Sequence, residues 1–171
     1  TYTNRAAGEL RSRLRSLGVG AVSVRTFHAA ALAQLEYFWP QLVGVPAPSI
    51  LDSKAKLIGI AAKSLSINLD NAALRDMASE IEWRKYSMLS MDEYGQLADS
   101  RPKVAGLSFQ KNLEIQKLYE QEKIRAQKLD WEDVLVLTLG LLKAEPRALA
   151  HVQSQYRFFT VDEYQDISPL Q

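Results

Sequence analysis

The sequence has 171 residues, of which 47% are hydrophobic and 24% are charged, so it can bury a core and does not have the composition of a disordered chain. Lys and Arg number 21 and Asp and Glu number 20, so the net charge is only +1. Any contact with nucleic acid must therefore depend on a few local positive groups and not on the charge of the whole chain. The lack of Cys excludes a disulfide framework and a thiolate metal site, and two histidines are too few for a His-based metal centre. No apolar run approaches the ~20 residues of a membrane span and no signal-like segment opens the chain, which favours a cytoplasmic protein.

The first fifth of the chain has the pattern of a strand end, a helix and a strand. Asn4 is expected to cap a helix that ends at Gly18 and Gly20. One face of that helix is apolar at helical spacing: Ala6, Ala7, Leu10, Leu14 and Leu17. A β-branched run over residues 22–26 predicts a short strand, and a second helix is expected over residues 28–37. This alternation indicates a parallel sheet.

The middle of the chain is expected to be entirely helical after a loop that contains Pro40, Pro46 and Pro48. The hydrophobic spacing predicts helices over residues 53–65, 71–86, 91–98, 108–129, 130–143 and 146–153, the last of them started by Pro146.

The end of the chain returns to the strand pattern. Phe158 to Val161 form a short apolar run, and the acidic segment Asp162-Glu163-Tyr164-Gln165-Asp166 follows at its C-terminal end. The order of elements therefore predicts an α-helical domain inserted into an α/β domain.

The acidic segment carries the clearest chemical pattern. Open α/β sheets bind ligands outside the carboxyl ends of their strands. Asp162 in that position can hold the Mg²⁺ of a bound nucleotide through water, and Glu163 can orient and deprotonate an attacking water. The alternative is a solvated acidic turn after a buried strand.

Five stretches in order resemble the UvrD/Rep type of superfamily 1 DNA helicases. Asp162 to Asp166 resemble motif II (Walker B), Thr1-Tyr2-Thr3-Asn4-Arg5-Ala6-Ala7 resembles motif Ia, and Thr26-Phe27-His28 resembles motif Ib. Ile81-Glu82-Trp83 and Leu129 to Leu135 resemble stretches of the family's helical insert. Tyr2 and Arg5 depart from the usual Phe and Lys but keep an aromatic ring and a positive charge.

The resemblance implies a mainly α fold, with a helical insert (domain 1B) flanked by α/β fragments of a RecA-like, P-loop NTPase motor (domain 1A). The expected domains are residues 1–28 (partial 1A, motifs Ia and Ib), 29–153 (domain 1B) and 154–171 (partial 1A, motif II). Because the chain opens on Thr1 rather than Met and stops soon after the acidic segment, we expect it to be a piece of a longer protein.

The resemblance also assigns roles to individual residues. It implies catalytic roles for Glu163 and Gln165, and a water-mediated role in holding Mg²⁺ and ATP for Asp162. DNA contacts are implied for the residues of motifs Ia and Ib: Tyr2, Thr3, Asn4, Arg5, Thr26, Phe27 and His28. Aromatic rings stack on any base, and hydroxyl, amide and guanidinium groups bind phosphate. Phe27 could instead be a core residue, and His28 a plain helix-start residue.

The implied activity is that of an ATP-dependent 3′-to-5′ helicase that translocates on single-stranded DNA and unwinds duplex DNA, in a DNA repair or replication-restart context. Its partners would be single-stranded DNA, duplex DNA and ATP, with protein partners at the insert and no membrane. The sequence contains no Gly-x-x-x-x-Gly-Lys-Ser/Thr phosphate loop, so the chain alone is expected to be inactive as an ATPase, with no cofactor bound. Two alternatives remain: a helical interaction module, and the motor of a helicase–nuclease subunit.

Overall fold

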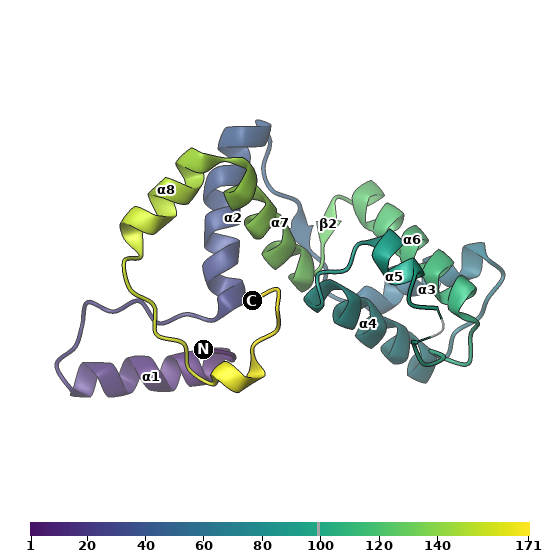
Figure 1. Cartoon of the computed structure of the whole chain (residues 1–171), viewed down its shortest axis with the longest axis horizontal. Coiled ribbons are helices and arrows are strands. Elements are labelled where there is room, and N and C mark those ends of the chain that lie inside the picture. The colour runs from purple at the N-terminus through teal and green to yellow at the C-terminus, as the bar shows by residue number, and fades with distance from the viewer. Residues whose placement is uncertain (99) are drawn as a thin grey trace. The chain divides into compact units, whose positions relative to one another are not determined.

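The computed structural model describes residues 1–98 and 100–171, and its secondary structure is mainly helical (Figure 1). Its elements are α1 (Asn4–Ser16), α2 (Phe27–Val43), β1 (Ser49–Ile50), α3 (Lys54–Ser64), α4 (Asn71–Tyr86), α5 (Met91–Gly95), α6 (Phe109–Arg125), β2 (Lys128–Leu129), α7 (Trp131–Ala144), α8 (Pro146–Gln155) and the 3₁₀ turn η1 (Tyr164–Asp166). Among these described residues, no helix is long and apolar enough to cross a membrane.

The chain divides into two compact units. Unit 1 comprises residues 1–47, 134–169 and 171, and unit 2 comprises residues 48–133 with Leu170. All of α2, all of α8 and most of α7 belong to unit 1. The expected domains, residues 1–28, 29–153 and 154–171, stay a prediction.

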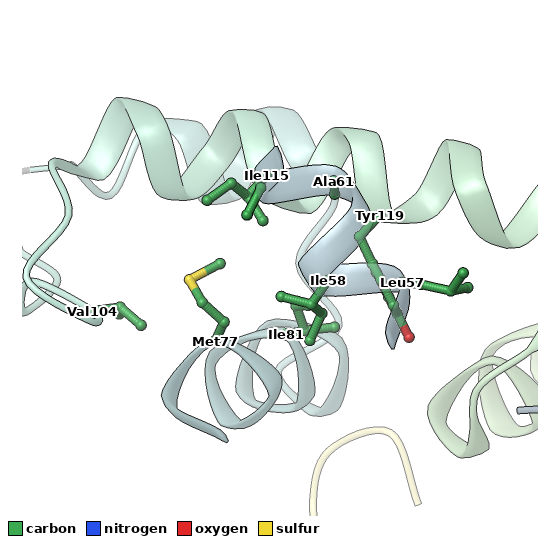
Figure 2. Close-up of a cluster of buried hydrophobic side chains, with 9 residues drawn as sticks. Leu57, Ile58, Ala61, Met77, Ile81, Val104, Ile115 and Tyr119 are labelled. Carbon is green, nitrogen blue, oxygen red and sulfur yellow. The ribbon is translucent and has the colours of Figure 1, made fainter. Parts of the chain in front are cut away.

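Unit 2 is built on a core between α3, α4 and α6 (Figure 2). Helix α3 contributes Leu57, Ile58, Ala61 and Ala62, α4 contributes Met77 and Ile81, and α6 contributes Ile115 and Tyr119. Each large apolar side chain buried in this way stabilises the fold by about 1.5–3 kcal/mol relative to exposure. This core is the reason that the helical periodicity of the middle segment predicts α3 and α4 to within a residue at each end.

Two short strands pair in parallel inside unit 2. Ser49 pairs with Lys128 and Ile50 with Leu129, and the Leu51 amide donates to the Leu129 carbonyl at 2.8 Å. The helix predicted over residues 108–129 is therefore too long, because α6 ends at Arg125 and Gln127 adopts a left-handed φ of 51° that turns the chain into β2.

Unit 1 contains α1, α2, α8 and most of α7. Leu35 and Phe38 of α2 and Val134 and Leu135 of α7 are buried in it. His151 of α8 stacks on Tyr37, with ring centroids 5.5 Å apart, and meets Phe38 edge-on at 5.6 Å. These contacts attach α8 to α2.

Two predicted strands are absent. Residues 22–26 and 158–161 are coil in the structure (Figure 1). A strand needs a neighbouring strand for its backbone hydrogen bonds, and within the described residues the β1–β2 pair is the only such ladder. Phe158 and Phe159 are accordingly 93% and 75% exposed.

Helix α2 is longer than predicted because Pro40 lies inside it rather than in a loop. Proline removes one amide donor, but the helix continues to Val43 and ends at Gly44, whose φ is 81° and whose amide donates to the Pro40 carbonyl at 3.0 Å.

Candidate functional site

The first residues of the chain form the start of α1. Thr3, not Asn4, is the cap: its hydroxyl accepts a hydrogen bond from the Ala6 amide at 3.1 Å, and Asn4 is the first helical residue. Tyr2, Asn4 and Arg5 are exposed. The first turn of a helix presents amide donors and a positive partial charge, so Arg5 lies where a phosphate is favoured.

Thr26, Phe27 and His28 form the start of α2. Thr26 is buried, and its hydroxyl accepts a hydrogen bond from the Ala29 amide at 3.2 Å, which makes it the N-cap of the helix. Phe27 and His28 are half-buried. Thr26 therefore has a structural function as a cap, and the two rings lie at the surface of unit 1 with part of each side chain accessible.

The acidic segment lies on the surface of unit 1. Asp162, Glu163 and Gln165 are all exposed, and Tyr164 to Asp166 form the turn η1. The Gln165 side-chain amide donates to the Glu163 carboxylate. Glu163 has a left-handed φ of 54°, a conformation that costs about 1–2 kcal/mol in a residue other than glycine. Such strain is common where a side chain must be presented in one direction.

Thr1 connects these segments. Its terminal ammonium group donates to the Arg25 carbonyl at 3.1 Å, next to Thr26, and its hydroxyl donates to Asp162 Oδ2 at 3.2 Å. Arg11 of α1 adds a second link, because its guanidinium donates to the Val24 carbonyl at 2.9 Å. The three segments singled out by sequence therefore meet in unit 1, joined through the residue that opens the chain.

The carboxylate of Asp162 fits a metal that is held through water. Oδ2 accepts from Thr1, and a carboxylate has further lone-pair sites for the water shell of a hard cation such as Mg²⁺. Among the described residues, no group of three His, Cys, Asp or Glu side chains is placed to hold a metal ion without other ligands.

A buried charge cluster in unit 2 is the main feature that the sequence did not predict. It consists of Lys85, Glu120, Lys123, Asp130 and Asp133. Asp130 Oδ2 accepts from the ammonium groups of Lys85 at 2.7 Å and Lys123 at 2.9 Å, and Lys85 also reaches Asp133 Oδ1 at 2.6 Å. Glu120 binds Lys85 at 3.1 Å and Lys123 at 2.7 Å.

The electrostatics of this cluster favour its charged form. Burial alone would raise the pKa of Asp130, but the adjacent Lys85 and Lys123 outweigh burial and hold that pKa well below its usual value. Burial would lower the pKa of Lys85, and Asp130, Glu120 and Asp133 reverse the effect and raise it. Burial and the Asp130 charge together raise the pKa of Tyr119, whose hydroxyl donates to Asp130 at 2.9 Å.

The spacing of the two lysines could have revealed the cluster. Lys85 lies four residues after the core residue Ile81, and Lys123 lies four residues after Tyr119, so each falls on the buried face of its helix. Asp130 and Asp133 lie at the start of α7, where the Asp133 amide donates to the Asp130 carboxylate at 2.9 Å and the Asp130 amide donates to the Asp133 carboxylate at 3.1 Å, as in a capping box. A lysine on a core face and two capping carboxylates together indicate a buried ion pair.

A second polar group surrounds Glu80. The Arg101 guanidinium donates to both Glu80 oxygens, at 2.9 and 2.5 Å, and lies 3.5 Å from the centre of the Trp83 ring. Tyr94 donates to Glu80 at 2.7 Å. The Ile81-Glu82-Trp83 stretch thus has a structural function here: Ile81 fills the core, and Trp83 stacks against a paired arginine.

Comparison with known proteins places this chain in a family. The model of the UvrD/REP helicase N-terminal domain matches residues 1–171. The chain is 38% identical over 182 residues to the ATP-dependent DNA helicase UvrD2 of Mycobacterium tuberculosis H37Rv, matching all of this chain and 26% of that protein. It is 30% identical over 178 residues to the ATP-dependent DNA helicase PcrA of Leuconostoc citreum and 28% identical over 176 residues to PcrA of Bacillus subtilis, in each case matching 100% of this chain and 23% of the relative. The chain spans about a quarter of the length of these relatives, and it belongs to the UvrD/Rep helicase N-terminal domain family.

Proposed function

We propose that this chain is the part of an ATP-dependent 3′-to-5′ DNA helicase that carries half of its nucleotide site and one edge of its single-strand channel. The observation that carries the proposal is the junction at Thr1, where the motif Ia segment, Arg25 and Asp162 meet. In such a protein, ATP hydrolysis drives translocation along single-stranded DNA and the unwinding of duplex DNA. The names of the relatives, which are ATP-dependent DNA helicases, support the proposal.

The proposed architecture assigns residues 1–28 and 154–171 to a RecA-like motor domain 1A and residues 29–153 to a helical insert, domain 1B. Helices make up nearly all the regular structure of the span 29–153, which supports the second assignment. The coil segments 22–26 and 158–161 become strands in this proposal when further strands of the motor sheet lie beside them.

The acidic segment supplies the proposed chemistry. A Mg²⁺–ATP complex would supply the phosphoanhydride bond to be broken and the positive charge that stabilises the departing ADP. Asp162 would hold the metal through water, and Glu163 would accept a proton from the attacking water. Gln165 fixes the Glu163 carboxylate through its hydrogen bond. The chain contains no phosphate loop, so the 171 residues alone are not proposed to turn over ATP.

DNA contacts are proposed at the starts of α1 and α2. Tyr2, Phe27 and His28 offer rings for stacking on bases. Thr3, Asn4, Arg5 and Thr26 lie at two helix N-termini, where amide donors and, at Arg5, a guanidinium suit phosphate.

The test is Glu163→Gln in the complete protein that contains this chain. The substitution keeps the shape of the side chain but removes the base, so ATP turnover is expected to fall about 10²–10⁴-fold while ATP affinity is retained. Steady-state ATPase rates and the equilibrium affinity for a fluorescent ATP analogue measure the two quantities. Glu36→Gln, an exposed glutamate on α2, is the matched control. Near-normal turnover in Glu163→Gln would remove Glu163 from the proposed role.

A further inference from the structure

Thr1 makes two hydrogen bonds to residues far along the chain. Its terminal ammonium group donates to the Arg25 carbonyl at 3.1 Å, and its hydroxyl donates to Asp162 Oδ2 at 3.2 Å. Figure 1 shows the N-terminus beside the turn that contains η1. Neither the motif pattern nor the helix spacing assigns a function to this threonine.

The hydroxyl constrains the carboxylate that it binds. A threonine hydroxyl has one proton to donate, and here it is directed to one oxygen of Asp162. The carboxylate would otherwise rotate freely at the surface, because Asp162 is exposed. With Oδ2 held, Oδ1 has a fixed direction in which to accept from a water molecule. Thr1 therefore has the chemistry to orient Asp162 without contacting a nucleotide.

Thr1 is also directly attached to the start of α1. Only Tyr2 separates it from Thr3, the cap of the helix, and Asn4 and Arg5 form the first turn. A phosphate bound at that turn would move or fix the backbone of residues 2–4. Because only Tyr2 and Thr3 separate Thr1 from the first helical residue, such a change has a short covalent path to the Thr1 hydroxyl.

We propose that Thr1 is a positioning residue that couples occupancy of the α1 N-terminus by single-stranded DNA to the orientation of the Asp162 carboxylate. The proposal rests on the functions proposed above for Asp162 and for the start of α1. Bound DNA fixes Thr1, Thr1 fixes Asp162, and Mg²⁺–nucleotide then binds more tightly. By thermodynamic linkage, Mg²⁺–nucleotide tightens DNA binding by the same factor.

The test compares Thr1→Val with Thr1→Ser in the complete protein. Valine keeps the shape of threonine and removes the donor, whereas serine keeps the donor. The first measurement is the affinity for a fluorescent ATP analogue at varied Mg²⁺, with and without an oligo(dT) strand. The second is the ATPase rate under the same conditions. In the wild type we expect DNA to raise the affinity for the ATP analogue about three- to tenfold. In Thr1→Val this enhancement should be largely or entirely lost, whereas in Thr1→Ser it should stay near the wild-type value.

Control variants separate this proposal from the proposed function. Thr160→Val alters an exposed threonine two residues before Asp162 and is expected to leave the DNA effect intact. Thr1→Ala repeats the test should valine impair folding. If Glu163→Gln abolishes turnover but Thr1→Val keeps the full DNA effect on nucleotide affinity, the coupling proposal is wrong and the helicase function stands. Equal loss in Thr1→Ser and Thr1→Val would also overturn it, because the hydroxyl would then be irrelevant. Normal turnover in Glu163→Gln would instead count against the function itself.

Discussion

Lys85 and Lys123 place two ammonium groups in the interior of unit 2, where an unpaired charge would cost several kcal/mol. Asp130 binds both, and Glu120 and Asp133 satisfy their remaining donors. Replacing such a cluster with apolar residues is often neutral, whereas removing one member leaves a buried charge unpaired. The cluster therefore specifies one arrangement: α4, α6 and the first turn of α7 are held together in one register.

The lowered pKa of Asp130 predicts how the stability of unit 2 depends on pH. Because the folded-state pKa of Asp130 lies below the ordinary value of 3.8, the stabilisation is complete above about pH 5 and is lost as the pH falls through 3.8 towards the folded-state pKa. The pKa of Glu120 is also lowered, by Lys85 and Lys123 against burial, so this side chain acts in the same direction. Urea unfolding of the chain between pH 3 and pH 7 should show this loss.

Asp130→Asn provides the comparison. The variant is expected to be less stable at pH 7 by about 3–5 kcal/mol, because two buried ammonium groups lose a charged partner, and its stability should vary less with pH than that of the wild type. Asp92→Asn, at an exposed position on α5, is expected to keep the wild-type profile. Parallel pH profiles for wild type and Asp130→Asn would contradict the assignment of the acid sensitivity to Asp130.

At the scale of elements, what the sequence could predict depended on how local each interaction is. The bounds of α4 follow from the helical spacing of its apolar residues and from its N-cap, Asp70, whose carboxylate accepts a hydrogen bond from the Ala73 amide at 2.8 Å. Residues 22–26 and 158–161 have strand composition, but a strand forms only against a partner, and that pairing is not encoded locally. The sequence pattern also placed Pro40 in a loop, whereas α2 continues past it through the exposed residues Leu42 and Val43 and ends only at Gly44.

The same distinction holds for the candidate site. The sequence pattern identified Asp162, Glu163 and Gln165 because they are adjacent in the chain. The contact between Thr1 and Asp162 spans 161 positions and could not be found from local spacing. The contact between Lys85 and Asp130 spans 45 positions, and local spacing indicates the lysine but not its partner. Only the position of Lys85 on a core face pointed to the second.

The turn between α6 and β2 gives a prediction about backbone strain. Gln127 has a φ of 51° and an exposed side chain, so glycine should relieve strain at this position without loss of packing. Gln127→Gly is expected to raise the free energy of unfolding by about 0.5–1 kcal/mol. Gln121→Gly, at an exposed position inside α6, should instead lower it by about 1 kcal/mol. Urea titrations of the two variants measure both changes, and a destabilised Gln127→Gly would show that the turn is not strained.

At the scale of the whole molecule, charge limits how this chain can bind DNA. The net charge is +1, so long-range attraction to a polyanion is small and binding must depend on a few local contacts. The exposed arginine at the start of α1, Arg5, has the geometry for one such contact. The two rings proposed for stacking, Tyr2 and Phe27, accept any base. Binding of single-stranded DNA by the chain should therefore be weak, sensitive to salt and indifferent to sequence.

Fluorescence anisotropy with labelled oligonucleotides at several salt concentrations tests this prediction. Each phosphate contact adds about −0.7 to the slope of log affinity against log salt for a single strand, so Arg5→Ala should make the slope shallower by about that amount. Arg15→Ala, at an exposed position near the other end of α1, should leave the slope unchanged, because the favourable potential of a helix N-terminus falls off within its first turn. If both substitutions shift the slope equally, binding is a diffuse property of the arginines of α1 and not of its N-terminus. Tight binding to one particular sequence that survives high salt would contradict a motor segment, since a protein that steps along DNA must hold every base alike.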